Sequence, residues 1–186
     1  MSVDKKQPGA RHTGQSMLAA LELERLYDAH ASALFGFLLQ LTRSEPDTRD
    51  LLQQVFVRLA SRPNTLDGVR DERAFLLRLA HNLFVDLTRR RDARQRHHDA
   101  FAAQPVDLFA ASPDPDTAAL RSELEAALAE LPSEQRAVVH LKLWEGLTFE
   151  AIAALLDIPL NTAASRYRYG LDKLRARLRP LYDEIQ

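Results

Sequence analysis

Apolar residues recur at helical spacing along most of the 186-residue chain. From Leu23 to Leu41 they fall three or four positions apart, which gathers them on one face of an α-helix. The same spacing returns between residues 51 and 59 and between residues 75 and 87. No segment alternates apolar and polar residues over a length that would suit a half-buried strand. The pattern therefore predicts an all-α protein.

Residues that start or stop helices set the expected boundaries in the first half of the chain. Residues 44–46 end the first long helix, and Asp47 or Thr48 is expected to cap the second. Residues 61–72 contain proline, asparagine and glycine and are interpreted as a loop. A third helix is expected between about residue 73 and about residue 91.

Residues 102–118 contain three prolines and three aspartates, a composition that opposes any regular element. Helical spacing resumes near Ala118, and Ser133 is expected to cap a further helix after Pro132. We therefore expect two small helical domains joined by a flexible linker. The expected divisions are a disordered tail at 1–16, a helical bundle at 17–100, the linker at 101–118 and a second helical domain at 119–186.

The net charge of −1 hides a segregation of charge along the chain. Residues 61–98 hold nine bases and five acids, residues 99–134 hold one base and eight acids, and residues 161–186 hold six bases and three acids. Two basic blocks around an acidic block suggest two anion-binding modules. The chain has no cysteine, no apolar run of membrane-spanning length and a polar N-terminus unlike a secretory signal, so we expect a cytoplasmic protein.

Residues 147–178 have the spacing of a helix-turn-helix. Thr148 caps a short helix, residues 157–159 form a tight turn, and Asn161 or Thr162 starts a second helix. Short polar side chains and arginines at the start of that second helix suit contacts with phosphates and base edges in a major groove. An ordinary helical hairpin with a solvated basic face is the alternative. The candidate DNA-binding residues are Asn161, Thr162, Ser165, Arg166 and Arg168.

Three segments of this second domain resemble region 4 of bacterial extracytoplasmic-function (ECF) sigma factors. They are residues 131–141, 147–153 and 161–175, and the resemblance implies a domain that reads the promoter −35 element. Ala164 stands where many members carry Lys or Arg, and Asp157 where many carry Gly.

The first domain resembles region 2 of the same family. Residues 26–30, 47–56 and 75–91 are similar to regions 2.1, 2.2 and 2.3–2.4 in the right order. Residues 66–76 are also similar to the iron-starvation subgroup, which is associated with ferric-siderophore uptake. An outward polar strip on a helix is usually only a solvated face. The resemblance implies instead that a strip on the second helix binds core RNA polymerase, and the residues concerned are Asp47, Asp50, Gln53 and Gln54.

A crowd of arginines ends the third expected helix. A helix dipole favours one or two bases at a helix C-terminus, but a larger cluster repels itself unless an anion such as the DNA backbone compensates it. The resemblance places this helix beside the −10 element, with Asn82 near the pocket for a flipped base. The candidate −10 residues are Asn82, Asp86, Arg89, Arg90 and Arg91.

These features predict an alternative sigma factor that recognises −10 and −35 elements and is not itself an enzyme. No catalytic residue, metal site or cofactor is expected, and Trp144 is interpreted as a core residue. The implied partners are core RNA polymerase, through the β′ clamp helices and the β flap, promoter DNA, and an anti-sigma factor that could be membrane-bound. A self-standing helix-turn-helix regulator and a DNA-processing enzyme are the alternatives, and co-purification with core polymerase separates them from a sigma factor.

Overall fold

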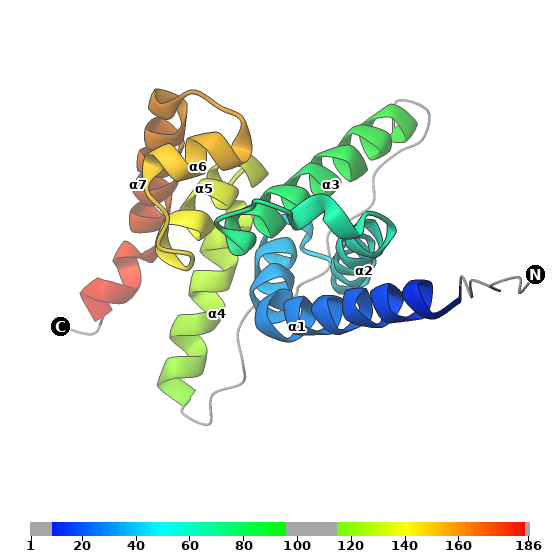
Figure 1. Ribbon diagram of the computed structural model, residues 1–186. Helices are drawn as coiled ribbons and strands as arrows, with labels where there is room; N and C mark the ends of the chain where they lie inside the picture. Colours follow the sequence, from blue (N-terminus) through cyan, green and yellow to red (C-terminus); the bar gives the residue numbers. More distant parts are fainter. Residues whose placement is uncertain (1–8, 96–114, 185–186) are drawn as a thin grey trace, which may run out of the picture.

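The computed structural model describes residues 9–95 and 115–184. Within these ranges every regular element is helical, which confirms the all-α prediction (Figure 1). The elements are α1 (Gly9–Thr42), α2 (Glu45–Ser61), the short 3-10 helix η1 (Pro63–Leu66), α3 (Glu72–Gln95), α4 (Pro115–Glu130), α5 (Ser133–Leu143), α6 (Phe149–Leu156) and α7 (Leu160–Glu184).

Helix α1 is longer than the apolar stripe that predicted it. It extends over 34 residues from Gly9, so residues 9–16 are helical and the expectation that they form a disordered tail is wrong. Residues 1–8 of that predicted tail lie outside the described residues. The chain has no proline between residues 9 and 42, and its alanines and leucines at 18–23 are strong helix formers. These residues allow the helix to continue before the buried stripe begins.

Helix α2 begins earlier than its predicted caps. Ser44 has an extended backbone and its side chain accepts a hydrogen bond from the Asp47 N–H at 3.4 Å. Thr48 is instead fully buried, and its hydroxyl donates to the Ser44 carbonyl at 2.9 Å. The proline at 46 fits the first turn of the helix because the amide it lacks would have no partner there. The prediction that Asp47 or Thr48 caps α2 is therefore wrong.

Helix α5 starts in the same way, one residue before the predicted position. Pro132 is the capping residue, Ser133 is already helical, and no side chain caps the end. The Pro132 carbonyl accepts hydrogen bonds from the N–H groups of Gln135 and Arg136, each at 3.0 Å. Ser133 is thus a first-turn residue and not the predicted cap.

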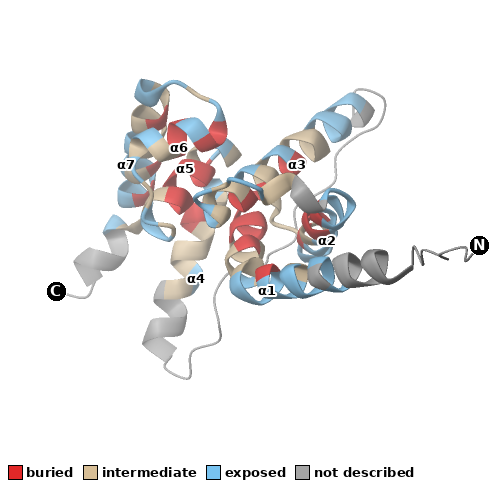
Figure 2. Ribbon diagram, viewed as in Figure 1, coloured by how far each residue is buried: buried red, intermediate tan, exposed pale blue. Residues whose placement is uncertain are grey.

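The N-terminal half consists of α1, α2 and α3, whose apolar faces meet in one core. Phe37 and Leu38 of α1, Val55 of α2 and Leu76 of α3 are fully buried there. Figure 2 shows the buried residues concentrated where these helices converge, while the outward side of α2 is exposed. This arrangement leaves the polar strip of α2 and the arginine-rich end of α3 at the surface.

The C-terminal half consists of α4 to α7. Leu128 of α4, Val139 of α5 and Leu174 of α7 form a small core between these helices. Gly170 lets α7 lie close to α5, because a Cβ at this position would lie 2.8 Å from Cγ2 of Val139. The resulting helical stack supports the pair α6 and α7 that carries the predicted helix-turn-helix.

The two halves pack directly against each other, α1 against α5 and α3 against α6. The rings of Phe37 and His140 lie 5.3 Å apart, and Nη1 of Arg43 donates to the Ala129 carbonyl at 3.1 Å. Buried residues of both halves belong to one continuous cluster. The two halves thus touch through residues far apart in the chain, which local sequence patterns do not reveal. Two helical domains joined by a flexible linker stay a prediction.

The predicted linker at 101–118 is shorter on its C-terminal side. Residues 115–118 form the first turn of α4, which begins at Pro115. Proline is favoured in a first helical turn. Residues 101–114 lie outside the described residues.

Candidate nucleic-acid interface

The helix-turn-helix is held in shape by local capping. The side chain of Thr148 accepts a hydrogen bond from the Ala151 N–H at 3.1 Å, so the predicted cap of α6 is confirmed. Asp157 ends α6 in the left-handed conformation, with a φ of 55°. The rings of Phe149 and Tyr167 pack edge to face at 5.4 Å and hold α6 against α7. These contacts hold α7 in a fixed orientation relative to α6, with the first turn of α7 at the surface.

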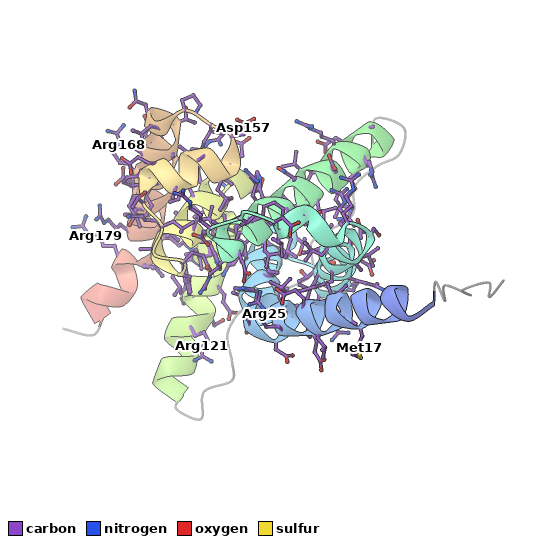
Figure 3. The ribbon with its side chains drawn as sticks, viewed as in Figure 1. Met17, Arg25, Arg121, Asp157, Arg168 and Arg179 are labelled. Atoms are coloured by element: carbon purple, nitrogen blue, oxygen red, sulfur yellow. The ribbon has the colours of Figure 1, made fainter. Side chains whose placement is uncertain are left out.

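The predicted DNA-binding residues of α7 differ in their solvent exposure and in the contacts that they already make within the protein. Asn161 and Arg168 are exposed, and Arg168 extends from α7 into solvent (Figure 3). Thr162 and Ser165 are half-buried, and the Ser165 hydroxyl donates to the Thr162 carbonyl at 3.1 Å. Arg166 is paired with Glu134 of α5 at 3.0 Å. Arg168 donates a hydrogen bond to the hydroxyl of its neighbour Tyr169 at 3.4 Å and lies 5.1 Å from the centroid of that ring. Asn161 and Arg168 are the exposed residues of this set and are therefore the best placed to reach a ligand.

The arginine-rich end of α3 presents a second exposed basic surface. Arg89 and Arg90 are exposed and make no ion pair with any described residue. Asn82 lies two turns earlier and is also exposed. Asp86 is half-buried and lies 3.9 Å from Arg58 of α2. This surface can accept an anion, because two of its arginines have no counterion among the residues that the structure describes.

Arg91 is different, because it donates two hydrogen bonds to Asp47 of α2, at 2.8 and 2.6 Å. Burial raises the pKa of the Asp47 carboxyl, but the hydrogen bonds from Arg91 and Ser44 outweigh it and hold the pKa below its usual value. The structure thus joins a predicted −10 residue to a predicted polymerase-binding residue. Both charges are already compensated, so neither is as free to bind a partner as the sequence suggested.

The polar face of α2 stands beside an apolar hollow. Asp50, Gln53 and Gln54 are exposed, as predicted from the helical spacing. A hollow of about 560 Å³ opens between α1 and α2, lined in part by Gln53 and by the half-exposed side chains of Tyr27 and Val57. Sequence reasoning missed these two residues. The sequence did contain an indication of this apolar surface: Val57 is an apolar residue one turn after Gln53, on the face of the helix expected to be polar.

The two candidate DNA-binding surfaces approach each other where the halves meet. Burial, and then the charge of Arg166 on α7, lower the pKa of His81 on α3 to about 4. His81 is the neighbour of Asn82 in the chain, so this part of α3 lies closer to Arg166 than the arginine-rich end does, which begins two turns further along α3. The prediction for Trp144, at the end of α5, is wrong. Trp144 was expected in the core, but it is 40% exposed at the end of α5 and stacks on His140 with ring centroids 5.3 Å apart.

Comparison with known families gives two matches in the same order. Residues 26–94 match the family model described as Sigma-70 region 2, and residues 121–174 match Sigma-70, region 4. The ECF RNA polymerase sigma factor SigL of Mycobacterium tuberculosis is 34% identical over 174 residues, which are 92% of this chain and 97% of SigL. The chain belongs to the ECF sigma factors. It is an alternative RNA polymerase sigma factor that directs transcription initiation.

Two further comparisons place this sigma factor among its relatives. The ferric citrate uptake sigma factor FecI of Escherichia coli is 30% identical over 146 residues, which are 77% of this chain and 83% of FecI. The solved sigma factor RpoE, in complex with the anti-sigma factor NepR from Bartonella quintana, has a TM-score of 0.68 at 18% identity and covers 85% of this chain and 97% of its own. The likeness confirms the two-part helical fold. No helix within the described ranges is long and apolar enough to cross a membrane.

Proposed function

We propose that this sigma factor binds core RNA polymerase through the exposed face of α2 and contacts promoter DNA through α3 and α7. In this proposal Asn82, Arg89 and Arg90 act at the −10 element. Asn161 and Arg168 contact the −35 element, supported by their neighbours Thr162, Ser165 and Arg166. The chain contributes recognition and carries out no chemical step of its own, and it acts in the cytoplasm where polymerase and DNA are found.

The exposed helix-turn-helix is the single observation that carries the DNA-binding part of the proposal. The first turn of α7 leaves backbone N–H groups unpaired by the helix, and this end carries a partial positive charge. Asn161 stands at that turn, and Arg168 lies two turns further along an exposed face. A helix start of this kind suits phosphate contacts, while asparagine and arginine side chains can read base edges.

The face of α2 supports the polymerase-binding part. Asp50 and the two glutamines are exposed, so their side chains do not contribute to the core. The neighbouring hollow adds apolar area from Tyr27 and Val57, each more than half exposed at 51% and 55%. A polar rim beside partly exposed apolar side chains is typical of protein–protein interfaces. Asp47 takes a smaller part, since Arg91 already holds its carboxylate.

Binding to core polymerase tests this assignment. The double variant Asp50→Arg with Gln53→Ala should lose binding to core enzyme at least tenfold while circular dichroism shows native helix, because both side chains are exposed. Asp172→Arg is the matched control: it makes the same charge change at an exposed position of α7 and should bind normally. Unchanged binding by the double variant would show that α2 does not contact polymerase. Tight promoter binding without polymerase would favour a self-standing regulator.

An anti-sigma factor is a further proposed partner of this chain. The structural neighbour RpoE was solved in complex with one, and its fold covers most of this chain. A protein that holds the two halves together would cover surfaces of α3 and of the helix-turn-helix beside the contact of α3 with α6. Its capture should compete with binding to core polymerase, which a titration with labelled core enzyme measures.

We also propose that, within the ECF family, the chain belongs to the iron-starvation subgroup. The resemblance at residues 66–76 and the 30% identity to FecI favour it, whereas SigL is more similar, at 34% over a longer stretch. Membership of the subgroup predicts that the transcripts this sigma factor directs rise when iron is withdrawn. Transcripts indifferent to iron would leave the chain in the ECF family and outside this subgroup.

A further inference from the structure

An ion pair joins α5 to the second helix of the helix-turn-helix. Nη2 of Arg166 on α7 donates to Oε2 of Glu134 on α5 at 3.0 Å. The backbones behind the pair lie close together, because a Cβ at Gly170, one turn after Arg166, would lie 3.7 Å from Cβ of Gln135. Gln135 is the neighbour of Glu134 in the chain. The close packing of α7 on α5 therefore places this acid and this base within reach of each other.

The pair contributes little to the stability of the fold. The Glu134 side chain is 66% exposed and the Arg166 side chain is 26% exposed. Water screens the attraction between charges that are this accessible, so an exposed ion pair adds little to the free energy of unfolding. Glu134 also lies in the first turn of α5, where the helix dipole favours an acid with or without a pairing base. Arg166 can therefore exchange this carboxylate for another anion with little loss of stability.

The two arginines of the predicted −35 set differ in this respect. Arg168 extends from α7 into solvent, contacts the ring of Tyr169, and has no ion pair with any described residue (Figure 3). The guanidinium of Arg166 is already bonded to a carboxylate. A guanidinium binds carboxylates and phosphates through the same N–H groups. Glu134 therefore occupies a donor of Arg166 that a phosphate of the DNA backbone would otherwise use.

We propose that Glu134 is a positioning residue that acts through Arg166 and lowers the affinity of the helix-turn-helix for duplex DNA. In the free chain the Glu134 carboxylate takes the place of a DNA phosphate. An arginine without a counterion releases cations from the duplex when it binds a phosphate, and this release favours binding. Arg166 must first leave Glu134, which then remains as an uncompensated negative charge beside the DNA backbone. Arg168 consequently contributes more to DNA affinity than Arg166 does.

The salt dependence of promoter binding tests the role of Glu134. The inference rests on the proposed function, which assigns α7 to promoter DNA, so the test uses holoenzyme assembled from core RNA polymerase and the full chain, on a promoter fragment that it transcribes. Glu134→Gln removes the charge and keeps the shape of the side chain. It should steepen the slope of log binding constant against log salt concentration by up to about 0.9, the value for one phosphate contact. Its affinity relative to that of the parent protein should therefore rise by up to about 3.5-fold when salt is lowered from about 200 to about 50 mM.

Glu130→Gln is the matched control. Glu130 is 64% exposed and accepts a hydrogen bond from Nε of Arg177 on α7 at 3.3 Å. Arg177 lies about 16 Å further along α7 than Arg166, and it also pairs with Glu123 at 3.2 Å. Because the same charge is removed far from the first turn of α7, this variant should bind DNA with the slope of the parent protein. Circular dichroism and thermal melting should show native helix in both variants, since both carboxylates are exposed.

Two arginine variants separate an effect through Arg166 from simple repulsion of DNA by Glu134. Arg168→Gln should flatten the slope by up to about 0.9, whereas Arg166→Gln should change it less, because Arg166 is already compensated. In the Glu134→Gln background, Arg166→Gln should remove most of the gain in affinity. The double-mutant cycle over Glu134 and Arg166 should thus show coupling of about threefold at about 50 mM salt.

Two results would overturn this role of Glu134. One is a Glu134→Gln protein whose slope and affinity match those of Glu130→Gln. The other is an equal gain with and without Arg166, since a carboxylate that only repels DNA does not need the arginine.

Arg168→Gln separates these failures from a failure of the proposed function. A flatter slope in Arg168→Gln together with no change in Glu134→Gln rejects the role of Glu134 alone. A slope that is unchanged in both variants removes α7 from the DNA interface and rejects the proposed function as well.

Discussion

The close approach of α7 to α5 makes a specific prediction at Gly170. A Cβ built at this position would lie 2.8 Å from Cγ2 of Val139, and 3.7 Å from Cβ of Gln135. Val139 is fully buried and β-branched, so its methyl group cannot rotate away at little cost. Gly170→Ala therefore forces α7 away from α5 or distorts Val139.

The expected magnitude is a difference between two opposing effects. Replacing glycine by alanine inside a helix stabilises it by about 1 kcal/mol. Overpacking a close-packed site costs about 1–3 kcal/mol. Gly170→Ala should thus lower the free energy of unfolding by up to about 2 kcal/mol. Gly36 in α1 is the matched control, since a Cβ there meets nothing within 4 Å and Gly36→Ala should stabilise by about 0.5–1 kcal/mol.

Urea unfolding followed by circular dichroism measures both variants. Val139→Ala removes the opposing methyl group, so it should cost less in the Gly170→Ala background than alone, and the double-mutant cycle should show favourable coupling. A Gly170→Ala protein as stabilised as Gly36→Ala would refute the close approach. It would mean that the helix-turn-helix is supported differently from the arrangement described above.

Two further predictions concern charge. Arg89→Ala with Arg90→Ala should weaken promoter binding across sequences and reduce the slope of log binding constant against log salt concentration by up to about 1.8, at roughly 0.9 per phosphate contact. Arg91→Ala should change this slope less, because Arg91 pairs with Asp47. An unchanged slope in the double variant would remove Arg89 and Arg90 from the DNA interface. The pKa of His81 is lowered to about 4, so the unfolded chain binds a proton that the folded chain does not between pH 6.5 and 4. The free energy of unfolding should therefore fall by at most about 3.4 kcal/mol as the pH falls through this window. His81→Gln should reduce the difference in unfolding free energy between pH 7 and pH 5, measured by urea titration; equal differences in both proteins would place His81 in solvent.

Features set by a few neighbouring residues could be predicted from the sequence. The cap at Thr148 and the turn at Asp157 were found because each depends on side chains within four positions. The caps of α2 and α5 were misplaced by one to a few residues, since serine, aspartate and threonine near a proline are all suitable candidates.

Contacts between distant residues could not be predicted in this way. Asp47 and Arg91 are 44 positions apart, and Arg73 and Glu145 are 72 apart. Each pair joins charges that separately look like solvated surface residues. The packing of α1 on α5 is likewise invisible to helical periodicity, which shows that a face is apolar but not which helix covers it. The sequence therefore predicted the helices and the exposed candidates, and missed the contact between the halves.

Transcription reconstituted from core RNA polymerase, this chain and a library of promoter fragments tests the central claim most directly. The account predicts transcripts that require the chain and arise from fragments sharing two elements about 25 base pairs apart from centre to centre, or about 85 Å along the duplex. Asn161→Ala with Arg168→Ala should alter the preference at the upstream element, and Asn82→Ala that at the downstream element. Transcripts that do not depend on the folded chain, or that share no pair of elements, would contradict the account.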